Sequence, residues 1–224
     1  MRTAVVILNW NTREYLRRFL PPLIGSLEGL DAEVVVADNA SGDGSRELLA
    51  EAFPGVRTIA FDRNYGFTGG YNRATGLLLG DDGGMAANHA GGRSGAPEFI
   101  VLINSDVMVE PSWLQPLVRH LETHAECGVC GPKLLSLRRE ADDFRKSDMF
   151  EYAGAAGGCI DRYGYPFCHG RVLGRTERDE GQYDRVQRVF WVSGACLAVR
   201  SETWRRLGGL DARFFAHMEE IDFC

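Results

Sequence analysis

Residues 99–106 read Phe-Ile-Val-Leu-Ile-Asn-Ser-Asp, an unbroken apolar run that ends on a polar Asn-Ser-Asp tip. Such a run is typical of a strand buried on both faces of a parallel sheet. Ligands of open α/β sheets gather beyond the carboxyl ends of the strands, so Asn104 and Asp106 fall where chemistry is expected. A carboxylate such as Asp106 suits Mg²⁺ or Mn²⁺, which proteins bind through one or two carboxylates together with substrate phosphates. The alternative is a plain turn, because Asn, Ser and Asp all favour turns.

Strands and helices alternate through the first half of the chain. Apolar runs predict strands at 3–8, 33–37, 56–61 and 99–103. Helical spacing predicts helices at 11–27, 46–53, 72–79 and 111–124. This alternation predicts an α/β fold with right-handed crossovers and a single, mostly parallel sheet that carries helices on both faces, Rossmann-like in its first half.

The remaining segments give weaker signals. The Gly-rich stretch 80–97 is predicted to be a flexible surface loop, because it holds too few apolar residues to pack. Residues 127–137 are expected to return to the sheet, 138–148 to form a solvated connection, and 154–174 to be irregular. A strand with a small-residue break is predicted at 190–200, followed by a short helix.

Composition bounds the class of protein. A chain of 224 residues with 45% hydrophobic content favours one large domain over 1–224. The net charge of -6 argues against a nucleic-acid partner. No apolar stretch approaches the roughly 20 residues that span a bilayer, and no leader precedes the first strand, so a cytoplasmic protein is expected. Peripheral contact with the inner face of a membrane stays open.

Six cysteines occupy positions 127, 130, 159, 168, 196 and 224. Cys127 and Cys130 have the C-x-x-C spacing of a zinc site, but no second pair with matching spacing follows. Reduced thiols, several of them buried, are the favoured interpretation.

Polar residues follow the first two strands. Residues 8–12 contain no G-x-G-x-x-G fingerprint, which argues against a nicotinamide or flavin site. Trp10 and Asn11 are candidates to line a base pocket, with simple packing as the alternative for Trp10. Asp38 ends the second strand, where a carboxylate can accept a hydrogen bond from a base N–H or a sugar hydroxyl. The alternative is that Asp38 and Ser41 shape a loop and cap a helix.

Two later segments add candidates. Residues 64–72, Asn-Tyr-Gly-Phe-Thr-Gly-Gly-Tyr-Asn, form a glycine-rich turn before a helix, which allows close approach of a ligand to the backbone. Glu219, Glu220 and Asp222 follow two phenylalanines and are candidates for a general base in a partly desolvated site. An acidic first turn of a helix is the alternative.

This ordered set of motifs resembles the family 2 glycosyltransferases of GT-A fold, in their bacterial rhamnosyltransferase-like branch. The resemblance covers nearly the whole chain and is carried by residues 5–11, 36–45, 64–72, 102–106, 193–195, 208–211 and 215–222. It implies an inverting transfer from a nucleotide diphosphate sugar to a glycan or lipid-linked acceptor, in polysaccharide or cell-wall biosynthesis. The donor favoured by the resemblance is dTDP-rhamnose, with UDP-sugars as the alternative.

The resemblance also implies roles for residues. Asp38 reads the base, and Asn104 and Asp106 hold the ribose, the diphosphate and a Mg²⁺ or Mn²⁺ ion with Asp106 as metal ligand. The other residues assigned to the donor site are Asn9, Asn11, Asn64, Gly66, Phe67 and Asn72. Glu220 is assigned as the catalytic base, with Glu219 and Asp222 as alternatives.

The sequence departs from the family pattern in two places. The family's usual Glu-Asp pair is Glu219-Glu220 here, which keeps a carboxylate but lengthens its reach by one methylene. The chain also stops at Cys224, where the family normally runs on through another helix and often a metal-binding His. A truncated nucleotide-sugar-binding module with weak turnover is therefore the main alternative function, and a sugar nucleotidyltransferase ranks lower.

Overall fold

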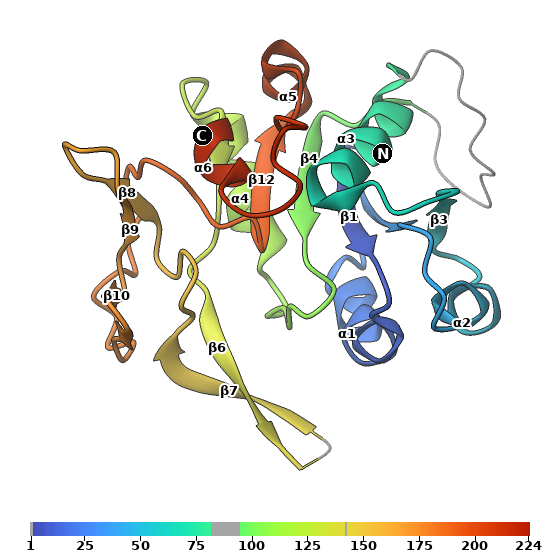
Figure 1. Ribbon diagram of the computed structural model, residues 1–224, viewed down its shortest axis with the longest axis horizontal. Coiled ribbons are helices and arrows are strands. Elements are labelled where there is room, and N and C mark those ends of the chain that lie inside the picture. Colours follow the sequence, from blue (N-terminus) through green and yellow to red (C-terminus); the bar gives the residue numbers. More distant parts are fainter. Residues whose placement is uncertain (1, 82–94, 142) are drawn as a thin grey trace. The chain divides into compact units, whose positions relative to one another are not determined.

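The computed structural model describes residues 2–81, 95–141 and 143–224 (Figure 1). Most of the loop expected at 80–97 lies outside these residues. Contacts divide the chain into two compact units, one formed by residues up to Cys130 together with Gly194–Phe223, the other by Gly131–Ser193 with Cys224. The sequence predicted one domain, since composition carries no signal for a division of this kind.

The first unit is built on a six-stranded sheet. Its strands, in chain order, are β1 Thr3–Asn9, β2 Ala32–Asp38, β3 Arg57–Ala60, β4 Phe99–Ile103, β5 Val129–Cys130 and β12 Cys196–Arg200, with spatial order β3-β2-β1-β4-β12-β5. Strands β3, β2, β1 and β4 run parallel, whereas β12 is antiparallel to β4 and β5. Of the predicted return at 127–137, only Val129–Cys130 joins this sheet.

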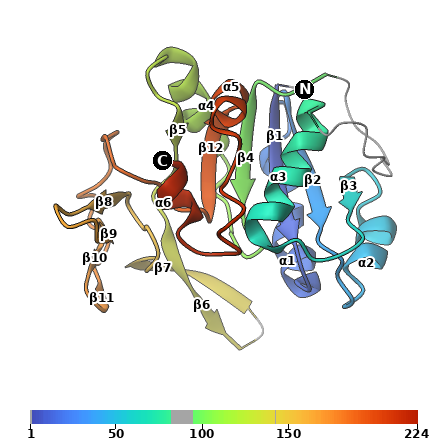
Figure 2. The same cartoon turned by 45° about the horizontal axis from the view of Figure 1, so that its top comes forward.

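Six helices belong to the same unit. They are α1 Arg13–Ser26, α2 Ser45–Ala52, α3 Gly66–Leu79, α4 Leu114–Thr123, α5 Ser201–Leu207 and α6 Glu219–Phe223. Helix α3 packs on β1 and β2, as Figure 2 shows, while α4 and α5 pack on β12. The predicted mostly parallel α/β sheet is confirmed.

Helix α3 begins six residues earlier than predicted, at Gly66, so most of the expected glycine-rich turn is helical. The glycines within it serve packing: a Cβ added at Gly70 would lie 2.6 Å from the Leu8 side chain of β1. The sequence signal was misleading because glycine disfavours a helix interior unless a close approach to a neighbour compensates.

The second unit consists of short antiparallel pairs. They are β6 Leu135–Glu140 with β7 Asp143–Phe150, β8 Gly158–Ile160 with β9 Pro166–Cys168, and β10 Arg171–Val172 with β11 Arg175–Thr176. The β6–β7 hairpin lies where the sequence predicted a solvated connection: most of its residues are exposed, as expected, but they form paired strands. Cross-strand pairing, including the Arg145–Glu140 ion pair at 3.1 Å, holds a charged segment in strand form.

The structure also bears on a zinc site at the cysteines and on a membrane-spanning helix. All six cysteines are free thiols, and Cys168 and Cys196 are buried. Among the described residues no group of three or more His, Cys, Asp or Glu side chains is placed to hold a metal ion. No helix in the described part of the chain is long and apolar enough to cross a bilayer.

Candidate active site

The carboxyl ends of β1 and β2 carry a buried polar network. Asn9 pairs in register with Asp38, and neither side chain has exposed surface. The Asp38 carboxylate accepts hydrogen bonds from Asn9 Nδ2 at 2.8 Å, from the Ser41 amide at 3.0 Å and from Arg46 Nε at 2.6 Å. These bonds fix the loop after β2 against the end of β1. In the structure the side chains of Asn9 and Asp38 hold this loop in place. Their direct contact with a base or a sugar stays a prediction.

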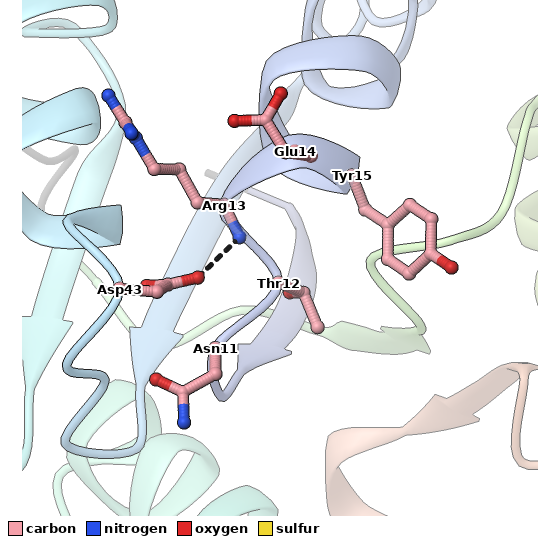
Figure 3. A pocket seen from close by; sticks show the side chains of 6 residues that line it. All are labelled: Asn11, Thr12, Arg13, Glu14, Tyr15 and Asp43. Atoms are coloured by element: carbon pink, nitrogen blue, oxygen red, sulfur yellow. Dashed lines mark hydrogen bonds between the residues drawn. The ribbon is translucent and has the colours of Figure 1, made fainter. Parts of the chain in front are cut away.

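An open pocket of about 230 Å³ lies at the start of α1 (Figure 3). It is lined by Asn11, Thr12, Arg13, Glu14, Tyr15 and Asp43. Asn11 has a positive φ of 56°, and its Oδ1 accepts from the Gly42 amide at 2.8 Å, which ties the two loops together. Asn11 lines this pocket, and its role in base binding stays a prediction.

Asp43 is a pocket residue that sequence reasoning did not single out. Its Oδ2 accepts from the Arg13 amide at 2.8 Å, drawn as a dashed line in Figure 3, and its Oδ1 accepts from the Ser45 amide at 3.0 Å. One carboxylate therefore satisfies amides at the starts of both α1 and α2. Thr12, the residue before α1, makes no side-chain cap hydrogen bond to that helix. A cap from a distant loop leaves no local sequence signal.

Asn104 and Asp106 follow β4. The Asn104 amide donates to the Ala195 carbonyl at 3.0 Å, which joins this turn to the start of β12. Asp106 is exposed, and its carboxylate makes no hydrogen bond or ion pair within the described residues. A free carboxylate beyond a central strand fits a hard cation whose remaining ligands come from phosphates and water.

The start of α3 packs against and hydrogen-bonds to Phe215, near the end of the unit. Asn64 Oδ1 accepts from the buried Asn39 side chain and from the Gly66 amide, both at 2.8 Å. Gly66 has a φ of +74°, and a Cβ there would lie 2.7 Å from the Phe215 ring. The Phe67 amide donates to the Phe215 carbonyl at 2.9 Å. Asn64 and Gly66 therefore shape this junction.

Asn72 holds the next loop. Its side chain donates to the Leu210 carbonyl at 2.7 Å and accepts from the Leu210 amide at 2.9 Å. Both polar groups of the amide are used on the backbone of residue 210. In this arrangement the Asn72 side chain supports the loop at Leu210. Its contact with a donor sugar stays a prediction.

The acidic pair lies directly after a left-handed turn. His217 and Met218 have φ of 74° and 71°, and α6 starts at Glu219. Glu219 is 4% exposed, and Glu220 is partly buried. One carboxylate oxygen of each is buried without a hydrogen-bond partner among the described residues. Asp222 is exposed.

Burial changes the acidity of this pair. Desolvation raises the pKa of Glu219, and the neighbouring Glu220 raises it further, while His217 opposes the change. Desolvation likewise raises the pKa of Glu220. Such carboxylates are better proton acceptors than exposed ones, which suits a general base.

Two neighbours connect the pair to other candidates. A Cβ at Gly194 would lie 3.6 Å from Glu220 Cβ and 3.8 Å from the Phe67 ring, so Phe67 and the pair flank one glycine. Burial first of all raises the pKa of the Tyr71 hydroxyl, and the charges of Asp106 and Glu219 add to that rise. The structure thus brings Phe67 and the acidic pair together at Gly194.

The sheet and the helices on its faces have the architecture of a GT-A fold. Residues 4–174, more than half of the chain, match the family described as "Glycosyl transferase family 2". The chain belongs to that family.

Relatives agree with this membership. The chain is 27% identical over 218 residues to an N-acetylglucosaminyl-diphospho-decaprenol L-rhamnosyltransferase of Mycobacterium tuberculosis (strain ATCC 25618 / H37Rv), covering 97% of this chain and 67% of the relative. It is 22% identical over 221 residues to the low-salt glycan biosynthesis hexosyltransferase Agl10 of Haloferax volcanii, covering 99% of this chain and 60% of the relative.

Solved structures share the fold. The mannosyltransferase PcManGT from Pyrobaculum calidifontis, in complex with GDP-Man and Mn²⁺, aligns with a TM-score of 0.58 at 16% identity over 99% of this chain. Staphylococcus aureus TarS 1-349 in complex with UDP aligns with a TM-score of 0.56 at 14% identity over 100% of this chain. The chain spans 50% and 54% of these two structures.

Proposed function

We propose that this protein transfers a sugar from a nucleotide diphosphate sugar to an acceptor hydroxyl with inversion at the anomeric carbon. The observation that carries the proposal is the buried Glu219–Glu220 pair, which keeps carboxylate oxygens unpartnered among the described residues. The rhamnosyltransferase relative supports dTDP-rhamnose as donor and a lipid-linked sugar as acceptor. A UDP-sugar donor and a glycan acceptor are the alternatives.

Glu220 acts as the general base. Its carboxylate takes the proton of the acceptor hydroxyl as that oxygen bonds to the anomeric carbon, while the bond from the anomeric carbon to the diphosphate breaks on the opposite face. Glu219 is more deeply buried, and its own pKa is raised first by burial and then by the neighbouring Glu220. Asp222 is exposed to solvent, unlike the two residues of the pair.

Asp106 is the residue that would hold Mg²⁺ or Mn²⁺, together with oxygens of the donor. When bound, such an ion supplies positive charge that offsets the charge growing on the leaving diphosphate. Asn104 lies in the same turn, and Asn11 lines the pocket at α1 that we assign to the base. The Mn²⁺ in the PcManGT complex supports a divalent ion.

The test combines nucleotide binding with turnover. Calorimetry with dTDP and UDP, with Mn²⁺ present or chelated, should show metal-dependent binding that Asp106→Ala abolishes. Glu202→Ala, a change at an exposed carboxylate of α5, is the matched control and should bind like the parent chain. Glu220→Gln should keep nucleotide binding and lower kcat by about 10²–10⁴-fold.

The outcomes separate the candidate functions. Metal-dependent binding without turnover of any matched sugar would favour a nucleotide-sugar-binding module. Formation of a nucleotide sugar from a sugar phosphate and a nucleoside triphosphate would favour the nucleotidyltransferase. Failure of a folded chain to bind either diphosphate would contradict the donor site.

A further inference from the structure

The β8–β9 hairpin, residues 158–168 of the second unit, exposes large apolar side chains. Tyr163 is 69% exposed, Tyr165 71% and Phe167 52%. In the β10–β11 hairpin that follows, Val172 on β10 is 63% exposed and Leu173 in the turn is 89% exposed. Single exposed apolar residues are common, but a cluster on one short hairpin and its neighbouring strand marks an interaction surface.

The tip of this hairpin is held in one conformation. Asp161 Oδ1 accepts from the amides of Tyr163 at 2.8 Å and Tyr165 at 2.9 Å. The Asp161 amide donates to the Tyr165 carbonyl at 3.0 Å, and Gly164 turns the chain with a φ of +88°. The two tyrosines are therefore presented outward by an ordered turn, which reduces the entropy lost when they bind a surface.

The formal charge of this segment is opposite in sign to that of the whole chain. Residues 158–176 hold three arginines and one aspartate, a formal charge of +2 in a chain of net charge -6. The Arg162 guanidinium lies 4.6 Å from the centre of the Tyr163 ring. Arg171 donates to the Tyr152 carbonyl at 2.8 Å, beside another exposed tyrosine. Aromatic and basic residues thus alternate along this segment.

We infer that this hairpin surface, residues 160–175, docks on an anionic lipid bilayer. Tyrosine rings favour the headgroup level of a membrane, because their bodies are apolar and their hydroxyls stay hydrated. Arginines beside them attract anionic lipid headgroups, each contributing about fivefold in binding. The aliphatic Val172 and Leu173 favour lipid over a glycan ligand, since sugars stack on aromatic rings and gain little from exposed aliphatic chains.

This inference rests on the proposed function in one respect, that a lipid-linked acceptor would lie at a membrane. The test uses the whole chain and sedimentation with vesicles of phosphatidylglycerol and phosphatidylethanolamine, compared with vesicles of phosphatidylcholine. We expect binding to the anionic vesicles, and a partition coefficient that falls about tenfold or more in Tyr163→Ser/Tyr165→Ser. Arg162→Ser should lower it about fivefold and weaken its dependence on salt.

Matched controls remove comparable groups from the first unit. Leu207→Ser takes away a 52% exposed apolar side chain of α5, and Arg17→Ser takes away an exposed arginine of α1. Both should bind vesicles like the parent chain. Circular dichroism and thermal melting establish that each variant is folded, because the changed side chains lie on the surface.

Three results would overturn the inference: no binding of the parent chain to anionic vesicles, hairpin variants that bind like the controls, or hairpin-dependent binding of soluble oligosaccharides in place of vesicles. Calorimetry with dTDP and UDP on the same samples separates this question from the proposed function. A chain that binds nucleotide but no vesicles contradicts the hairpin alone. A chain that binds vesicles but no nucleotide contradicts the donor site alone.

Discussion

The side-chain amide of Asn72 forms two hydrogen bonds with the backbone of Leu210, one in each direction, at 2.7 and 2.9 Å. A side chain of α3 thereby forms the backbone hydrogen bonds that a neighbouring strand would otherwise provide to this loop. Next to it, Gly209 has a φ of +77°, and a Cβ there would lie 2.4 Å from Asn72 Oδ1. The motifs at 64–72 and 208–211, more than a hundred residues apart in the sequence, thus form one junction. From this junction the chain continues toward Glu219 and Glu220.

Asn72→Asp should lower the free energy of unfolding by about 1–3 kcal/mol. The aspartate keeps an acceptor for the Leu210 amide but loses the donor for its carbonyl, and places two oxygens together. Urea unfolding followed by tryptophan fluorescence measures the change. Gly76→Ala on the same helix is the control, since a Cβ there meets nothing within 4 Å, and it should raise stability by up to about 1 kcal/mol. An unchanged urea midpoint in Asn72→Asp would show that the junction contributes nothing.

Gly66→Ala should destabilise more than Gly80→Ala. Both glycines flank α3 with nearly equal φ, +74° and +75°, so the backbone cost of a side chain is matched. Only at Gly66 does the new Cβ meet the Phe215 ring, at 2.7 Å, whereas at Gly80 no atom of the described residues lies within 4 Å. We expect a difference of about 1–3 kcal/mol in the free energy of unfolding, measured by urea denaturation.

The double variant Gly66→Ala/Phe215→Ala isolates the clash. It should recover part of the loss relative to Gly66→Ala, because the colliding ring is gone. If the effects of Gly66→Ala and Phe215→Ala on the free energy of unfolding were additive, the packing explanation would be refuted.

The sequence predicted the elements whose signal is local. The apolar run of β4, the alternation of strands and helices, and the position of Asp106 beyond the end of β4 all follow from neighbouring residues. The antiparallel β12 was predicted as a strand, but its direction was not, because direction depends on the crossover that precedes it.

Long-range bonds account for what the sequence did not predict. Asn9, Asp38, Asn64 and Asn72 were assigned to ligand contacts, yet each uses its side chain on other parts of the protein. Polar residues in a functional motif look alike in sequence whether they contact a ligand or hold the residues that do. The sequence did not single out Asp43, because its bond to the Arg13 amide joins residues thirty positions apart.

Asp43→Ala should lower the free energy of unfolding by about 1–3 kcal/mol, because amides at the starts of α1 and α2 lose their acceptor. Burial raises the pKa of the Asp43 carboxyl, but hydrogen bonds from Ser45 and Arg13 outweigh this and leave that pKa below its ordinary value of 3.8. The stabilisation is therefore present above pH 3.8 and is lost as the pH falls through the folded-state pKa. Urea unfolding at neutral and acidic pH measures both effects.

Glu51→Ala is the control for Asp43, being an exposed carboxylate of α2. It should change stability by no more than about 0.5 kcal/mol. If Asp43→Ala behaved in the same way, the shared cap would not contribute to stability.

Phe150→Ala should loosen the second unit and leave the first intact. Phe150 is 1% exposed and packs with Ala155, Ala156, Leu135 and Tyr183 in a core of its own. Removing the ring costs about 3–5 kcal/mol, and so small a core has little stability in reserve. Hydrogen exchange followed by mass spectrometry should show lost protection across 131–193 and unchanged protection in β1 and β4. Equal loss in both units would support the single cooperative domain that the sequence predicted.

The pH dependence of stability should identify the buried acidic pair. Desolvation raises the pKa of Glu219 above its ordinary value of 4.5, so in the range just above pH 4.5 the folded chain holds a proton that the unfolded chain has released. The free energy of unfolding should therefore fall as the pH rises from 4.5 and level off above the folded-state pKa. Glu219→Gln cannot ionise, so its stability should fall less over that range and exceed that of the parent chain at neutral pH. Glu202→Gln, at an exposed carboxylate of α5, should leave the pH profile unchanged. Parallel profiles for the parent chain and Glu219→Gln, measured by urea unfolding from pH 4 to 8, would mean that Glu219 is solvated in the folded protein, and the argument for a desolvated base beside it would fail.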